Sequence, residues 1–404
     1  MILRTTARSR IPRGLWWTAS ATAGSPREPR PALCPAALAE HGCVMAGPIR
    51  ERTALDVLAT RAIDGEPLGR AEALGVLGTP EEMLLDLVAA AARVRRHYFA
   101  DRVRLHFLVN MKSGLCPEDC SYCSQRRGSS ADVATYAWAN ADEVADVCDR
   151  AVAAGVRRVC LVASGRGPSE RDVARVAQTI SAIRKRRPGV EVCACLGLLR
   201  DGQGEMLRDA GVLAYNHNLN VAEDRYPEIC TTHSFADRKG TLERARRAGL
   251  SPCSGVIFGL GEDDAEVVDL LFALRAEEPD SVPVNFLIPF DGTPAHERWD
   301  LTPLRCLKIL ALCRLAFPAT DVRIGGGREI HLRALQPLAL HLATSIFLGD
   351  YLTSEGAPAA GDLAMIADAG FVVEGLDGTG VPTPTAGTVA LRRRGIGTGK
   401  PANV

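Results

Sequence analysis

Short runs of apolar and β-branched residues recur along the chain at regular intervals. Eight of them predict strands, at residues 105–109, 158–163, 190–196, 212–215, 252–258, 282–288, 321–324 and 345–348. Segments with helical periodicity lie between them, at 141–154, 171–186, 235–248, 265–276 and 303–316. Strands that alternate with helices over about 250 residues predict parallel β/α units closed into an α/β (β/α)8 barrel of the TIM type. An open, doubly wound sheet has the same periodicity and stays an alternative.

Residues 66–100 show helical spacing of Leu and Ala before the first predicted strand. Within this stretch, Thr79 followed by Pro80 resembles a helix start, with Thr79 as the N-cap and Pro80 at the first helical position. We therefore expect helices to precede the barrel, and we assign residues 49–375 to the folded domain.

Both ends of the chain differ from this domain in composition. Residues 1–44 contain six arginines and only two glutamates, without a sustained apolar period. We interpret residues 1–48 as a disordered or mis-started extension, with a mitochondrial transit peptide as the alternative. The Gly-, Thr- and Pro-rich residues 376–404 are expected to form a disordered tail.

The overall composition excludes several classes of protein. The chain has 48 basic and 48 acidic residues, a balance that argues against nucleic acid or an anionic membrane as the main partner. No run of 18 apolar residues occurs, so a soluble protein is expected. Thirteen cysteines without a secretory signal indicate reduced thiols and metal ligands. The predicted location is the cytoplasm, or the mitochondrion only if the first 44 residues are a genuine transit peptide.

The strongest chemical signal is a loop of three closely spaced thiols after the first predicted strand. Cys116, Cys120 and Cys123 have the spacing Cys-x3-Cys-x2-Cys. Three thiolates around an iron–sulfur cluster leave one iron open to an outside ligand, whereas electron-transfer clusters usually have four. Structural zinc would need a second pair of ligands, and a disulfide is disfavoured because the thiols are crowded. The spacing, with Tyr122 before the last cysteine, is similar to the radical S-adenosylmethionine signature.

Four further residues lie within later predicted strands. They are Cys160, Cys193, Cys253 and Arg323. A single cysteine in a strand is usually a small buried hydrophobic residue. If all four point into the lumen of one barrel, however, they form a second and deeper metal site. Cys195 lies on the same strand face as Cys193, so it stays an alternative to that residue.

Several longer segments, in order, resemble the biotin synthase family of radical S-adenosylmethionine enzymes. The resemblance covers about residues 70 to 370 and rests on the segments at 116–123, 215–219, 253–255, 284–285, 291–294 and 322–329. It implies that Cys116, Cys120 and Cys123 bind a catalytic [4Fe–4S] cluster whose open iron is chelated by S-adenosylmethionine. It also implies that the four strand residues, Cys160, Cys193, Cys253 and Arg323, bind a [2Fe–2S] cluster that donates sulfur.

The same resemblance implies contacts for several other residues. Those expected to bind the cofactor are Tyr122, Asn216, Asn218, Arg238, Gly255, Ile257 and Gly259, and those expected to bind substrate are Asn218 and Asn285. Asn216 and Asn218 could instead serve only to shape a loop. Arg238 could be an ordinary surface arginine. Arg323 is an unusual ligand, since a guanidinium stays protonated, and a salt bridge is its alternative role. Asn220 stands where the family often has Asp.

The implied reaction is radical insertion of sulfur into dethiobiotin to give biotin. A flavodoxin or ferredoxin electron donor is expected with it, and so is a homodimer, for which the sequence has no separate signal. A different radical enzyme, such as a hydrogenase-cofactor maturase or a mutase, would share the cysteine loop but would not need the four strand residues. An iron–sulfur carrier or a zinc protein would not need the run at residues 255–262, which matches the GxIxGxxE pattern of radical enzymes.

Overall fold

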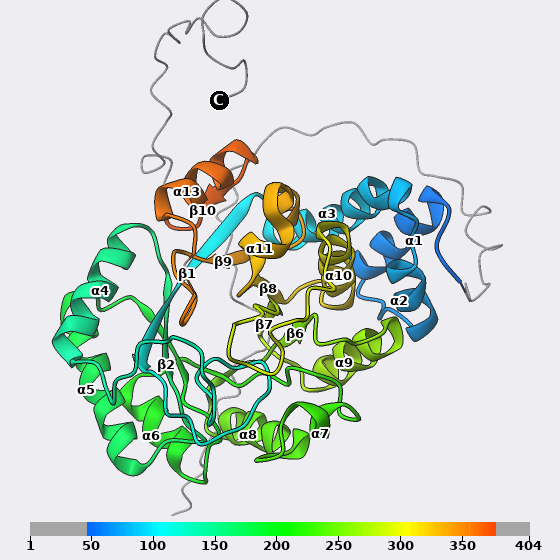
Figure 1. Ribbon diagram of the computed structural model, residues 1–404. Coiled ribbons are helices and arrows are strands. Elements are labelled where there is room, and N and C mark those ends of the chain that lie inside the picture. The colour runs from blue at the N-terminus through cyan, green and yellow to red at the C-terminus, as the bar shows by residue number, and fades with distance from the viewer. Residues whose placement is uncertain (1–46, 355, 377–404) are drawn as a thin grey trace, which may run out of the picture. The chain divides into compact units, whose positions relative to one another are not determined.

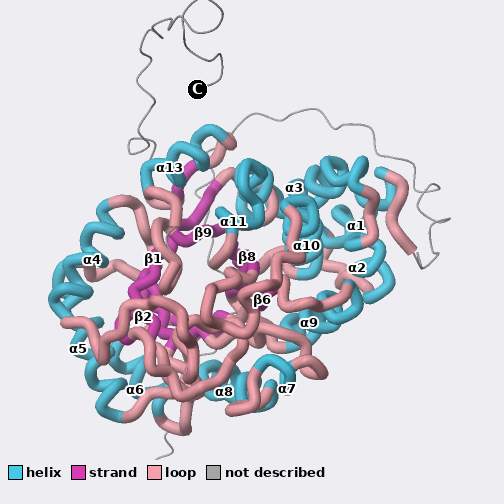
Figure 2. Tube along the Cα trace, in the orientation of Figure 1, coloured by secondary structure: helices cyan, strands magenta, loops and turns pink. Residues whose placement is uncertain are grey.

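The computed structural model of the chain describes residues 47–354 and 356–376. Nearly all of the expected N-terminal extension and C-terminal tail lies outside the described residues. The described chain is an α/β barrel in which parallel strands are surrounded by helices (Figures 1 and 2). The barrel strands are β1 Arg102–Lys112, β2 Arg158–Ala163, β3 Glu191–Cys195, β4 Ala214–Asn216, β5 Ser251–Cys253, β6 Val256–Phe258, β7 Ser281–Phe286, β8 Asp321–Ile324 and β9 Ser345–Phe347.

The sheet closes on itself through its first and last barrel strands. β1 pairs in parallel with β2 on one side and with β9 on the other, where Leu105 is in register with Ile346. Because β5 and β6 both pair with β7, they share one position, and the barrel has eight positions. The short β10 (Val372–Val373) pairs with the first residues of β1. The TIM-type prediction is confirmed, and the open sheet is wrong.

The strand predicted at residues 252–258 is divided into β5 and β6. Ser254 and Gly255 interrupt it, and the Gly255 N–H donates to the side-chain oxygen of Asn218 at 3.0 Å instead of to a neighbouring strand. A Cβ at Gly255 would lie 1.9 Å from the carbonyl oxygen of Pro283 in β7. The two backbones therefore approach so closely that only glycine fits between them.

The helices lie outside the strands and before them. They are α1 Arg52–Ile63, α2 Arg70–Leu77, α3 Leu84–Phe99, α4 Ala141–Ala153, α5 Glu170–Arg186, α6 Gln203–Ala210, α7 Tyr226–Ile229, α8 Phe235–Arg247, α9 Asp264–Ala276, α10 Pro303–Ala316, α11 Arg328–Leu332, α12 Gln336–Leu340 and α13 Ala359–Asp368. α1, α2 and α3 precede the barrel, as expected, and pack against α10.

The predicted helix start at Thr79 is wrong in detail. Pro80 stands at the N-cap of a short 3-10 turn, Glu81–Met83, and α3 follows that turn. The Thr79 hydroxyl donates backwards to the carbonyl oxygen of Gly75 at 3.2 Å, so it completes the end of α2. Threonine serves either role, because its hydroxyl bonds whichever backbone group is nearer.

Side-chain caps define the starts of the barrel helices. Asn140 accepts hydrogen bonds from the first turn of α4, and Ser169 and Ser234 form capping boxes with Asp172 and Asp237. These caps come directly after strand-to-helix loops, so they determine where each loop ends.

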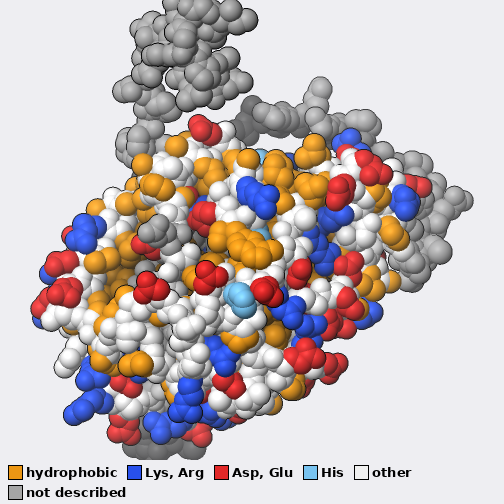
Figure 3. Space-filling model, in the orientation of Figure 1, with side chains coloured by type: hydrophobic (Ala, Val, Ile, Leu, Met, Phe, Trp, Pro, Cys, Tyr) orange, Lys and Arg blue, Asp and Glu red, His pale blue; other side chains and the backbone are white. Residues whose placement is uncertain are grey.

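The surface and the interior have different chemistry. Basic and acidic side chains are interspersed over the face shown in Figure 3, in keeping with a formal net charge of zero. Every residue of β7 is buried, as parallel strands covered by helices require. Among the described residues, no helix is long and apolar enough to cross a membrane.

Candidate active site

The three-cysteine loop follows β1 and is held by its own backbone and one glutamine. The N–H of Cys116 donates to the carbonyl oxygen of Gln125 at 3.0 Å, and the Gln125 side chain accepts from the N–H of Gly114 at 3.0 Å. The N–H of Cys123 donates to the carbonyl oxygen of Cys120 at 3.1 Å. All three thiols line one cavity of about 300 Å³. The loop therefore presents its thiols to a common space.

The environment of these thiols suits a metal centre. Burial raises the pKa of the Cys123 thiol to about 11, and it also raises the pKa of Cys116. A hydrogen bond to Cys230, together with burial, raises the pKa of Cys120. Neutral thiols are poor nucleophiles, but iron displaces their protons and stabilises the thiolates. The residues present therefore fit an iron–sulfur cluster.

A second group of thiols lies in the strands beside this cavity. Cys160 in β2 is in register with Cys193 in β3, and both belong to one cluster of buried side chains. The neighbouring thiols of Cys160 and of Cys253 in β5, together with burial, raise the pKa of Cys193. Cys193 and Cys253 are fully buried, and Cys160 lines the cavity. The structure thus brings together the three strand cysteines that the sequence singled out.

Arg323 completes this group from β8. Its guanidinium donates to the Cys253 thiol at 3.9 Å, to the Ser281 hydroxyl at 2.7 Å and to the Asp321 carboxylate at 3.1 Å. Burial opposes its charge, but Cys253 and Asp321 outweigh burial and raise the pKa of Arg323. The salt bridge considered as its alternative role is present. Ligation of a metal by Arg323 stays a prediction.

Cys193 and Cys195 differ in what they contact. Cys193 is fully buried in a cluster with Cys160, and the thiols of Cys160 and Cys253 raise its pKa. Cys195 lines the cavity instead, and burial raises its pKa to about 12. The contacts favour Cys193 as the third member of the group and place Cys195 as a separate thiol on the cavity wall.

The polar residues implied by the resemblance lie around the same cavity. Tyr122, Asn216, Asn218, Arg238, Ile257 and Asn285 all line it. Gly255 and Gly259 do not, and close contacts with Pro283 and Leu301 explain why those two positions are glycines. Their contact with a cofactor stays a prediction that the cavity lining does not support.

Asparagines at the end of β4 and directly after it form hydrogen bonds with residues of both thiol groups. Asn216 donates to the Cys253 thiol at 3.3 Å and to the side-chain oxygen of Asn218 at 3.0 Å. Asn220 has a positive φ of 70° and donates to the Tyr122 hydroxyl at 2.5 Å. They therefore shape this end of the barrel and also present polar atoms to the cavity.

Arg238 is not a surface residue, and the ordinary interpretation of it is wrong. It lies on α8 but is buried, and its guanidinium donates to the backbone oxygen of Asn218 at 2.7 Å and to His233 at 2.9 Å. It also donates to the hydroxyl of Tyr226. A fixed cation thus stands on the cavity wall beside the cysteine loop, where it can meet a carboxylate.

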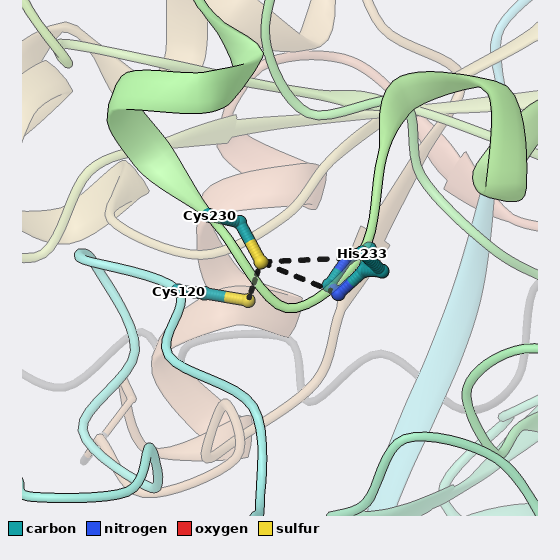
Figure 4. Close-up of side chains that lie close together, drawn as sticks. All are labelled: Cys120, Cys230 and His233. Atoms are coloured by element: carbon teal, nitrogen blue, oxygen red, sulfur yellow. Dashed lines mark hydrogen bonds between the residues drawn. The ribbon is translucent and has the colours of Figure 1, made fainter.

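Sequence reasoning missed two residues next to this loop, Cys230 and His233. Their side chains converge on Cys120 from the segment between α7 and α8 (Figure 4). The Cys120 and Cys230 sulfurs lie 3.7 Å apart. The Cys-x2-His spacing is itself a signal of possible metal ligation, but its proximity to residue 120 is not visible in the sequence.

Comparison with known proteins agrees with this geometry. The model of the Radical SAM superfamily matches residues 111–274, and that of the Biotin and Thiamin Synthesis associated domain matches residues 283–372. With a three-cysteine loop at the end of β1 and a closed parallel barrel, the chain is a radical S-adenosylmethionine enzyme. This class implies a [4Fe–4S] cluster and S-adenosylmethionine.

Curated relatives give the particular family. The chain is 58% identical over 346 residues to the biotin synthase of Streptomyces avermitilis, covering 85% of this chain and 89% of that protein. It is 57% identical over 353 residues to biotin synthase 2 of Frankia casuarinae, covering 86% and 98%. The chain belongs to the biotin synthase family.

Solved structures with similar folds are more distant. Methylornithine synthase has a TM-score of 0.68 at 21% identity, covering 78% of this chain and 96% of that chain. The FeFe-hydrogenase maturase HydG from Carboxydothermus hydrogenoformans has a TM-score of 0.68 at 21% identity, covering 80% and 79%. At this identity the likeness shows the barrel fold alone.

Proposed function

We propose that this chain converts dethiobiotin to biotin with two iron–sulfur clusters, a [4Fe–4S] cluster on the loop and a [2Fe–2S] cluster in the strands. The observation that carries the proposal is the group formed by Cys160, Cys193, Cys253 and Arg323 beside the cavity that the loop thiols also line. A radical enzyme of another kind would need the loop alone.

The chemistry of the reaction requires such an arrangement. The carbons that receive sulfur in dethiobiotin carry unactivated C–H bonds, which no side-chain acid or base can ionise, so a radical is needed. When bound, the loop cluster and S-adenosylmethionine supply that radical, and the strand cluster supplies the sulfur.

The residues of the loop and of the strands have distinct tasks in this proposal. Cys116, Cys120 and Cys123 hold three irons of the loop cluster and leave the fourth to S-adenosylmethionine. The strand thiols would hold the second cluster beside the same cavity. Arg323 either ligates it or offsets its negative charge, and its pairing with Asp321 holds the guanidinium in place.

The cavity wall orients the two small molecules. Arg238 binds the carboxylate of S-adenosylmethionine, since it is a buried cation beside the loop. Asn285 binds the urea group of dethiobiotin through its amide. The N–H of Gly326 and the hydroxyl of Tyr351 donate to the Asn285 oxygen at 2.9 Å each, and these bonds hold the amide in one orientation.

Apolar side chains protect the reactive space. Leu108, Val162, Ile257, Phe286 and Phe347 line the cavity between the polar groups. Exclusion of water and of stray hydrogen donors keeps the radical available for substrate.

Iron counting combined with an activity assay tests the proposal. Reconstituted without oxygen, the wild type is expected to hold about six irons per chain, and Cys160→Ala about four. Cys195→Ala is the matched control, because it removes a cavity thiol from the same region and is expected to hold about six irons. With dethiobiotin, S-adenosylmethionine and a reductant, the wild type is expected to form biotin and 5'-deoxyadenosine.

Two results would contradict the proposal. One is an iron count that is the same for the wild type and Cys160→Ala. The other is a wild type with both clusters intact that forms neither product. A flavodoxin or ferredoxin donor and a homodimer remain predictions, which reduction assays with either donor and sedimentation of the intact protein would check.

A further inference from the structure

Cys230 is a buried thiol in contact with the radical-cluster loop. It follows α7, is 3% exposed, and its sulfur lies 3.7 Å from that of Cys120 (Figure 4). This distance is within hydrogen-bond range for two sulfur atoms. None of the ligand roles proposed above requires a thiol at this position.

A metal site is the first explanation to consider. One ligand atom each from Cys120, Cys230 and His233 lies within 4.8 Å of the others, a spacing that a single metal ion could bridge. Both ring nitrogens of His233 are already engaged, however. Nε2 faces Arg238 at 2.9 Å and the Tyr226 hydroxyl at 2.7 Å, and Nδ1 contacts the carboxylate of Glu118. Cys120 is also committed to the loop cluster, so a separate metal ion is disfavoured.

These partners assign the tautomer of His233. A guanidinium only donates, so Nε2 must accept from Arg238, and the ring hydrogen is therefore on Nδ1 and points to Glu118. Nδ1 lies 3.3 Å from the Cys230 sulfur but has no lone pair for a thiol hydrogen. His233 therefore packs against Cys230 without accepting from it.

The carboxylate of Asp119 is also occupied. In the cluster-free chain its Oδ1 accepts from the Cys230 thiol at 3.3 Å, and it also accepts from the N–H of Thr231 at 2.9 Å, from the N–H of Thr232 at 3.3 Å and from the Thr232 hydroxyl at 3.1 Å. Three other donors therefore keep this oxygen satisfied when the Cys230 thiol turns away from it. The remaining neighbour is the Thr232 hydroxyl at 3.4 Å, which is a neutral acceptor.

The direction of the sulfur–sulfur contact depends on the state of Cys120. Without a cluster, Cys120 donates to Cys230. A cysteine that ligates iron is a thiolate and has no hydrogen to donate, so in the loaded enzyme the hydrogen must come from Cys230. A charged thiolate is also a stronger acceptor than the Thr232 hydroxyl.

We propose that Cys230 is a positioning residue for the radical cluster, and that its thiol donates a hydrogen bond to the cluster-ligating sulfur of Cys120. Such a bond stabilises the reduced, more negative form of the cluster and makes its reduction potential less negative. The proposal rests on the [4Fe–4S] assignment of the loop. It assigns Cys230 an effect on the reduction potential of that cluster, exerted through the ligand Cys120.

The test measures the midpoint potential of the loop cluster in anaerobically reconstituted protein. The EPR signal of the reduced [4Fe–4S] form is recorded as a function of the applied potential. Cys230→Val removes the donor but suits the site, because residue 230 has extended backbone (φ −151°) and valine favours that conformation. The expected result is a shift of the midpoint to a more negative potential. Cys230→Ser keeps a hydroxyl donor, so its midpoint is expected between those of Cys230→Val and the wild type.

Controls separate this effect from damage to the fold. Cys148→Ala removes a buried thiol from α4 and is expected to leave the midpoint unchanged. Iron content and circular dichroism are measured for every variant, and the Ser variant provides a readout if the Val variant loses its cluster. A serine midpoint more negative than that of the wild type then supports the proposal, and a serine midpoint equal to that of the wild type contradicts it.

Three outcomes would overturn the inference. The first is a Val variant with four irons on the loop and the wild-type midpoint. The second is loss of loop iron in both the Ser and the Val variant with the fold intact, which would make Cys230 a ligand. The third is a zinc ion bound by the cluster-free chain and lost in Cys230→Ser. Failure of the wild type to assemble any [4Fe–4S] cluster would instead refute the proposed function.

Discussion

At the scale of single residues, the site depends on polar and ionisable groups that burial holds in one state. Arg238 and Arg323 are both buried, and hydrogen bonds hold each guanidinium in place: Arg238 donates to the Asn218 carbonyl oxygen, and Arg323 donates to Asp321 of its own strand. Asn216 is bonded to the Cys253 thiol rather than only to its own turn. The properties of these side chains therefore come from their neighbours more than from their residue type.

His106 lies outside the cavity, but its ionisation is also controlled by its neighbours. We therefore expect the stability of the fold to depend on pH. Its ring is fully buried, and neither nitrogen has a hydrogen-bond partner among the described residues. Burial and the charge of Arg323 hold the pKa of His106 well below its ordinary value. The unfolded chain therefore binds a proton near pH 6 that the folded chain does not.

Stability should consequently fall as the pH falls below about 6.5, by up to about 1.4 kcal/mol per pH unit for this group. His106→Leu is expected to lose less stability than the wild type between about pH 7.5 and about pH 5.5. Thermal unfolding at the two pH values measures the difference. The exposed His97→Leu is the control, and equal pH dependence in all three proteins would contradict the prediction.

At the scale of elements, the interruption between β5 and β6 positions the site. It brings the Gly255 N–H to Asn218 and leaves Cys253 at the end of β5, facing the other strand thiols. A continuous strand would have paired this backbone with β7 throughout. The interruption depends on the close contact between Gly255 and Pro283.

Substitution of this glycine is expected to be costly. In Gly255→Ala the new Cβ would meet the Pro283 carbonyl oxygen at 1.9 Å, and β7 must move to relieve the overlap. We expect the free energy of unfolding to decrease by about 3 kcal/mol. Chemical denaturation measures the change.

Gly361→Ala is the matched control for this substitution. Gly361 lies within α13, and nothing stands within 4 Å of its added Cβ. Alanine is favoured in a helix, so the variant should be unchanged or more stable by up to about 1 kcal/mol. If the two variants lost stability equally, the close-approach argument would be wrong.

At the scale of the whole molecule, barrel closure assembles the two proposed cluster sites around one cavity. The loop thiols follow β1, while the inner group comes from β2, β3, β5 and β8. Their ligand atoms meet only when β1 pairs with β9 and the sheet is closed. The proposed clusters thus bind the folded chain and not the unfolded one.

Cluster loading should therefore stabilise the fold. We expect chelator-stripped protein to unfold roughly 5–10 °C below the anaerobically reconstituted protein. Differential scanning calorimetry under nitrogen measures the gap. Cys160→Ala should show a smaller gap, because it retains only the loop cluster, and identical midpoints for loaded and stripped wild type would be inconsistent with ligation from separate strands.

Much of the fold could be predicted, because local pattern and barrel topology agree. Residues 158–163 and 321–324 are strands with the predicted boundaries, and α10 has the predicted ends. α6 and α7 were not predicted, since they are too short to show a clear period. Thr79 was misplaced because its hydroxyl has two backbone groups within reach.

The amino-acid sequence alone determined the eight strand segments and the three-cysteine loop, because each is a matter of spacing along one segment. Only the tertiary structure decided that Arg238 is buried, that Cys193 rather than Cys195 meets the other strand thiols, and that Cys230 lies against Cys120. These facts depend on contacts between segments far apart in the chain, and spacing within one segment carries no information about such contacts.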